Sequence, residues 1–291
     1  MQPLTWDHRP SGLRAPALLC AFRGWNDAGE AATAAVSFFN SALEGRRFAW
    51  TDAEEFFDDQ ATRPRIELVD GVTREIEWPA LEIFEAPVPR APRDLVLMVG
   101  PEPSLRWRSF SALIVELAEA LGVQMVVTVG ALLAEIPHTS SVPMTGLASD
   151  PALVERLGLK GSSYEGPTGI VGVVHRACAE AGVPAVSLWA SVPHYVAAAP
   201  NPKAALALLR RLEGLVGVSV DASALERAAA DYERQVGLAV QSDPDIQAFV
   251  ERLEQATESE EQPLNPEELP SGDILAREFQ RFLRQRGGEA G

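Results

Sequence analysis

The stretch ALLCAFRGWNDAGEAATAAVSFFNSAL, residues 17–43, decides the fold class. Its first six residues form a short apolar run, which is typical of a fully buried strand. Turn residues follow, and the pattern from Ala28 to Leu43 is helical, with Asp27 and Glu30 at the spacing of a capping box. A buried strand that leads directly into a helix predicts a βαβ unit and a parallel sheet.

The same alternation continues beyond this stretch. Further strands are expected at residues 94–99, 124–129, 144–148 and 184–189, and further helices at 104–121, 168–180 and 202–215, with a short helix starting at Asp150-Pro151. Helices of ten to fifteen residues between strands indicate an α/β core with a largely parallel sheet and helices on both faces. We expect this core domain to span residues 1–220.

The segment near residues 48–88 departs from this alternation. Arg65–Val69 and Arg74–Trp78 flank Asp70-Gly71, a pair that favours a hairpin turn, and Leu81–Phe84 is a further strand candidate. The segment is therefore expected to be an antiparallel insertion or extension of the sheet.

No strand pattern follows Asp221, so residues 221–291 are predicted to be a helical C-terminal region. Two amphipathic helices are expected first, the second starting at Asp243-Pro244. An acidic linker is predicted near residues 254–270. A last helix over 273–286 would place five apolar side chains on one face, which needs either the core or a neighbouring subunit to cover it: Ile274, Leu275, Phe279, Phe282 and Leu283.

The composition narrows the class of partner. In 291 residues, 46% are hydrophobic and 23% charged, which suits a globular protein with a sizeable core. The 25 Lys and Arg residues against 41 Asp and Glu give a net charge of −16. A nucleic-acid partner is not expected, because binding a duplex requires concentrated positive charge.

Metal, cofactor and membrane sites are not expected either. Cys20 and Cys178 are far apart in sequence and form no CxxC pair. No motif for a metal or a cofactor is present. The polar residues 1–10 do not resemble a signal peptide, and no apolar run reaches the roughly 20 residues that span a bilayer, so we expect a cytoplasmic protein.

Ligands of open parallel sheets bind outside the carboxyl ends of the strands, so the loops there hold the candidate site residues. In the first loop, Gly24 permits a sharp turn, and Asn26 and Asp27 precede a helix whose N-terminus can hold an anion. The alternative is that Asp27 caps the helix and repels an anion.

Two further loops contain histidines. Glu135 and His138 lie three residues apart after a predicted strand and can form an acid/base pair, or else only order a long loop. His194 and Tyr195 follow the strand that ends at Trp189, where they are either functional groups or the rim of the apolar core. Glu135, His138 and His194 are thus the catalytic candidates, and Tyr195 is a ligand-binding candidate.

The remaining loop is rich in glycine and leads into a helix. Gly166 and Gly169 allow close backbone approach, Glu165 is charged, and Thr168 is a natural N-cap. These residues are candidates for binding phosphate or carboxylate, although the spacing matches neither a P-loop nor GxGxxG.

Four of these stretches together resemble the proteasome assembly chaperone two family in its bacterial, actinobacterial form: residues 22–29, FRGWNDAG; 135–139, EIPHT; 164–170, YEGPTGI; and 187–196, SLWASVPHYV. Asn201-Pro202 and residues 270–273, PSGD, are also similar to this family. The resemblance implies a three-layer α/β/α fold akin to phosphorylase- and hydrolase-like folds. It also favours a homo-oligomer, for which a trimer is one arrangement.

Two functional hypotheses follow. The first is a homo-oligomeric assembly or scaffold protein with a protein partner, which the resemblance and the predicted last helix favour. The alternative is a small-molecule-binding protein or a hydrolase or transferase whose site lies across the strand-end loops. The sequence leaves open whether the chain is an enzyme.

Overall fold

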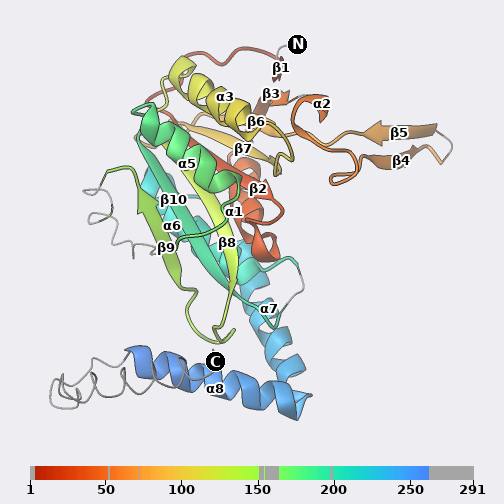
Figure 1. Cartoon of the computed structure of the whole chain (residues 1–291), viewed down its shortest axis with the longest axis vertical. Coiled ribbons are helices and arrows are strands. Elements are labelled where there is room, and N and C mark those ends of the chain that lie inside the picture. The colour runs from red at the N-terminus through yellow and green to blue at the C-terminus, as the bar shows by residue number, and fades with distance from the viewer. Residues whose placement is uncertain are drawn as a thin grey trace, which may run out of the picture.

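A computed structural model describes residues 4–51, 53–71, 73–150, 154, 164–196 and 199–261. An eight-stranded sheet in the order β1-β3-β6-β7-β2-β8-β10-β9 forms the centre (Figure 1). The four middle strands are parallel: β7 (Leu95–Pro101), β2 (Ala17–Arg23), β8 (Met125–Ala134) and β10 (Ala185–Pro193). The outer strands pair antiparallel: β1 (Leu4–Trp6), β3 (Arg46–Thr51), β6 (Glu82–Ala86) and β9 (Met144–Ala148).

Helices cover both faces of this sheet. One face packs against α1 (Ala31–Ala42) and α6 (Pro202–Val216), and the other against α3 (Trp107–Ala120) and α5 (Ile170–Glu180). Along β2, Leu19 points to the first face, and Leu18 and Cys20 to the second. Burial on both sides explains why the strands are continuous apolar runs. The predicted three-layer α/β/α fold with a largely parallel mixed sheet is confirmed.

The antiparallel insertion is also present. β3 and β6 extend the main sheet, and a short helix, α2 (Ala53–Phe56), follows β3. Strands β4 (Arg65–Val69) and β5 (Thr73–Glu77) form a separate two-stranded hairpin, which we call the arm, and which projects from the body (Figure 1). Asp70 and Gly71 at its turn both have positive φ angles, 53° and 72°, the conformation that this pair favours.

Several element ends differ from the predictions. β8 and β10 run on to Ala134 and Pro193 because the two strands pair with each other in register to their last residues. The helix predicted from Ala28 begins as a 3₁₀ turn, Ala28–Glu30, and α1 starts only at Ala31, because Glu30 is left-handed. The capping box is therefore wrong in detail, and Asp27 instead accepts the N–H groups of Ala32 and Thr33.

The C-terminal region begins with two helices, α7 (Ser223–Gln241) packed on α6 and α8 (Pro244–Glu261) packed on α7. The acidic linker was predicted to start near residue 254, which is wrong, because α8 continues to Glu261 and Glu254 accepts a hydrogen bond from Thr139. The rest of that linker and the predicted last helix lie outside the described residues, as does most of the short helix predicted from Asp150-Pro151. The division into domains at residue 220 stays a prediction.

The helices of the described ranges include none that combines the length and the apolar character needed to cross a membrane.

Candidate functional site

Glu102, which follows β7, joins two of the predicted loops. Its Oε1 accepts hydrogen bonds from Asn26 Nδ2 at 2.6 Å and from the backbone N of Ile170, the first residue of α5, at 2.9 Å. A Cβ on Gly169 would lie only 2.2 Å from the Asn26 amide, so glycine is needed for this close approach. A carboxylate is favoured at a helix N-terminus. Glu102 therefore occupies the position at α5 where an anionic ligand would be bound.

Asp27 has the corresponding role at the N-terminus of α1. Its Oδ1 accepts from the Ala32 N–H at 2.7 Å, and its Oδ2 from the Thr33 hydroxyl at 2.5 Å. Burial raises the pKa of Asp27, while the hydrogen bonds from Thr33 and Ala32 act in the opposite direction. Of the two interpretations of Asp27, helix capping describes these contacts. Ligand binding by Asn26 and Asp27 stays a prediction.

A cavity of about 850 Å³ lies beside α5 and over part of β9 and β10. Gly166, Thr168 and Gly169 line it, whereas Glu165 is exposed. The N-cap of α5 is Gly169, so the predicted capping by Thr168 is wrong; the Thr168 hydroxyl donates to the Gly169 carbonyl at 3.3 Å instead.

The cavity is surrounded by large apolar side chains that are open to solvent. Trp25 and Leu133 are 67% and 57% exposed, and the full set, which we call the apolar rim, is Trp25, Leu132, Leu133, Leu147 and Tyr164. Inside, burial lowers the pKa of His175, so its ring is neutral at pH 7. Its Nδ1 has no hydrogen-bond partner within the described residues.

His138 belongs to a different cluster, on the α7 side of the sheet. The Tyr195 hydroxyl accepts from the His138 N–H at 2.6 Å and lies 2.8 Å from His138 Nδ1. Lys203 Nζ donates to the His138 carbonyl at 2.5 Å and pairs with Glu233 at 2.6 Å. The contacts found for His138 do not include Glu135, which is exposed. The predicted acid/base pair is not brought together.

Two pKa shifts determine the protonation states of His138 and Tyr195 in this cluster. Burial, together with the nearby Lys203 ammonium, lowers the pKa of His138, and burial raises the pKa of Tyr195 to about 12. At neutral pH the imidazole is therefore uncharged and the phenol keeps its proton. The hydroxyl can then donate to Nδ1 while it accepts the backbone N–H, which is a structural arrangement.

His194 and Tyr195 also hold α8. The Phe249 ring of α8 lies 5.5 Å from the His194 ring and 5.9 Å from the Tyr195 ring, both nearly perpendicular. The His194 N–H donates to the Ala134 carbonyl at 3.1 Å. Three of the sequence-predicted site residues, His138, His194 and Tyr195, thus gather where the ends of β8 and β10 meet the C-terminal helices, away from the lining of the cavity beside α5.

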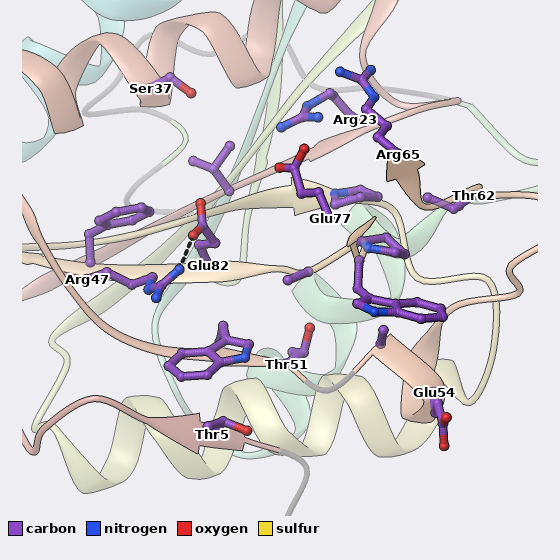
Figure 2. A pocket seen from close by; sticks show the side chains of 18 of the residues that line it. Thr5, Arg23, Ser37, Arg47, Thr51, Glu54, Thr62, Arg65, Glu77 and Glu82 are labelled. Carbon is purple, nitrogen blue, oxygen red and sulfur yellow. Dashed lines mark hydrogen bonds and ion pairs between the residues drawn. The ribbon is translucent and has the colours of Figure 1, made fainter. Parts of the chain in front are cut away.

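A second cavity, of about 930 Å³, lies at the root of the arm and was not predicted from the sequence. Figure 2 shows Arg23, Arg65 and Glu77 gathered at one end of it, and an ion pair between Arg47 and Glu82 with an N–O distance of 2.6 Å at the other. Arg23, Arg65 and a further lining residue, Arg63, form no ion pair within the part of the chain that the structure describes. Four arginines and three glutamates line the cavity in all, which is a small positive excess in a chain of charge −16.

Comparison with known proteins agrees with this architecture. The model of the PAC2 family matches residues 21–240. A PAC2 family protein from Streptomyces avermitilis is 47% identical, with a TM-score of 0.75, and the match covers 81% of this chain and 99% of that one.

Two further solved structures are similar. A proteasome-assembly chaperone homologue from Mycobacterium tuberculosis is 44% identical, with a TM-score of 0.75, over 80% of this chain and 99% of that chain. A protein of unknown function from Corynebacterium glutamicum is 26% identical, with a TM-score of 0.80, over 89% of this chain and 98% of that chain. No curated protein matches the sequence.

Proposed function

The chain belongs to the PAC2 family, and on that premise we propose that it is an assembly or scaffold protein that forms a homo-oligomer and holds other protein chains. The partner class that we propose is an unassembled proteasome subunit, since the Mycobacterium tuberculosis relative at 44% identity is a proteasome-assembly chaperone homologue. A cytoplasmic location is part of the same proposal.

The observation that carries the proposal is the apolar rim. Five large apolar side chains surround one cavity of about 850 Å³ and remain open to solvent. Contiguous exposed apolar surface of this kind is typical of protein interaction sites, where aromatic residues such as Trp25 and Tyr164 are enriched.

The polar candidates support a binding surface rather than a reaction centre. Glu102 and Asp27 already accept hydrogen bonds at the N-termini of α5 and α1. An anionic ligand therefore cannot bind at either helix end. The His138 imidazole is bonded to Tyr195 and does not line the cavity. These side chains join strand ends to helices and so fix the shape of the surface that a partner meets.

The test uses purified proteasome subunits from the same organism and the full-length protein immobilised on resin. We expect it to retain the unassembled subunits, and a variant with Trp25→Asp and Leu133→Asp to retain less than about a tenth as much. Both positions are exposed, so these substitutions leave the core intact. Loss of this size corresponds to about 1.4 kcal/mol or more of binding free energy.

The matched control is Arg108→Glu, an equally charge-changing substitution at an exposed position of α3 away from the rim. It should retain subunits as the wild type does. Equal retention by the rim variant and the wild type, or no retention by the wild type, would contradict the proposal.

A further inference from the structure

The arm has two chemically different faces, which its pairing register defines. Ile66 lies opposite Ile76 and Leu68 opposite Arg74, so these four share one face. Arg65 lies opposite Glu77 and Glu67 opposite Glu75, so the other face is mostly charged, although Val69 also lies on it. Ile66, Leu68 and Ile76 are 62%, 64% and 52% exposed. The apolar face is therefore uncovered within the described part of the chain.

Such a hairpin is unlike the rest of the molecule. A two-stranded sheet alone in water is marginally stable and needs a third strand, or a helix packed against its apolar face. Trp78, which follows β5 directly, adds a further half-exposed indole at the root of the arm. Exposed apolar side chains grouped in this way have the composition of a docking surface.

We propose that this face binds residues 273–286 of a second copy of the chain, an inference that rests on the homo-oligomer of the proposed function. This segment lies outside the described residues, and its sequence predicts a helix with one apolar face: Ile274, Leu275, Phe279, Phe282 and Leu283. The arm and this segment each have an apolar face that needs covering, so each can cover the other.

Charge favours the same pairing. Residues 65–77 of the arm contain two arginines and four acidic residues, whereas residues 273–286 contain four arginines and two acidic residues. The arm is thus acidic and the segment is basic, although the whole chain is acidic. Two copies that met through two acidic surfaces would instead repel each other.

The length of the segment and the charges at its two ends define how the helix is oriented along the arm. A five-residue strand is about 17 Å long, and a helix over residues 274–283 is about 15 Å long, so one covers the other from end to end. Glu267 and Glu268, just before the segment, then reach the arginine-lined cavity at the root of the arm, and Arg284 and Arg286 reach Asp70 at its tip.

We place the contact between copies because the chain leaves the body far from the arm in Figure 1. The segment follows α8, at the bottom of Figure 1, whereas the arm extends from the upper part of the molecule. One copy therefore offers its C-terminal segment to the arm of the next. This is a heterologous contact, which closes into a ring when the rotation between copies permits.

The test links two separately prepared full-length variants by a disulfide. One preparation contains Leu68→Cys or Ile76→Cys on the arm, and the other contains Phe279→Cys or Phe282→Cys and a tag that changes its size. The native Cys20 and Cys178 are buried and do not compete. After mixing and mild oxidation, we expect a mixed pair of tagged and untagged chains on a non-reducing gel for at least one combination.

The matched controls place the cysteine on the charged face of the same strands, Glu67→Cys and Glu75→Cys. These control variants should form less than about a tenth as much of the mixed pair as the apolar-face variants form. Linking as efficient as that of the apolar positions overturns the inference. A double variant, Leu68→Cys with Phe282→Cys, that links only within one chain also overturns it, because the contact would then be internal.

Light scattering on the unmodified protein separates this inference from the proposed function. An oligomer that gives no mixed pair for any combination overturns docking on the arm and leaves the homo-oligomer standing. A monomer at all concentrations overturns both.

Discussion

Replacing Glu102 with alanine tests whether this carboxylate holds the strand ends together. The substitution removes the acceptor of two hydrogen bonds, from Asn26 Nδ2 at 2.6 Å and from the Ile170 N–H at 2.9 Å. Asn26 is only 1% exposed, so water cannot replace the lost partner there. The first N–H of α5 also loses its cap.

The magnitude follows from these two bonds. A hydrogen bond to a charged group contributes about 1.5–3 kcal/mol, and the partial exposure of Glu102 favours the lower end. We expect Glu102→Ala to lower the free energy of unfolding by about 3 kcal/mol, which lowers Tm by roughly 6 °C in a domain of this size. Glu102→Gln keeps one carbonyl acceptor and should cost about 1 kcal/mol.

The assay is urea unfolding followed by circular dichroism, with Glu116→Ala, an exposed position of α3, as the matched control. The control should stay within about 0.5 kcal/mol of the wild type. If Glu102→Ala unfolds at the same urea concentration as the control, Glu102 neither joins these loops nor stabilises the N-terminus of α5.

Two further predictions concern other contacts. Asp94 accepts hydrogen bonds from the backbone N–H groups of Arg14 at 2.7 Å and Val88 at 2.8 Å. Burial alone would raise the pKa of Asp94, but the hydrogen bonds from Arg14 and Val88 outweigh burial, so this pKa is lowered. A lowered carboxyl pKa stabilises the fold above the unfolded value of about 3.9 and ceases to do so as the pH falls through the folded value. Asp94→Asn should therefore cost about 2 kcal/mol at pH 7 and much less at pH 3; a constant difference in urea unfolding between these pH values would refute the assignment. Phe249→Ala removes the ring that contacts His194 and Tyr195, at about 0.5–1.5 kcal/mol for each aromatic pair. Amide hydrogen exchange should rise along α8 and stay unchanged in β2, and unchanged exchange along α8 would show that these rings do not hold it.

Much of the fold could be predicted because its signals are local. The apolar run of β2, the helical period after it and the Asp70-Gly71 turn each lie within a few residues of one another, and all three were confirmed. The start of α1 was misplaced because the left-handed Glu30 depends on the packing of the turn against Asn201, whose N–H donates to the Gly29 carbonyl. No local pattern contains that contact.

The site was harder to predict for the same reason. Glu102 stands 76 residues from Asn26 and 68 from Ile170, so nothing near it in the sequence marks it as the partner of both. Its place at the end of a predicted strand was the one available signal. The loop histidines were correctly placed at strand ends, but their contacts with α8 depend on a helix more than fifty residues further along the chain.

The assembly role can be tested by native mass spectrometry of the full-length chain mixed with purified, unassembled proteasome subunits from the same organism. We expect a species whose mass combines several copies of the 31.4 kDa chain with at least one subunit. A spectrum that contains only free subunits and the 31.4 kDa monomer, at concentrations where an assembled proteasome survives, would contradict it.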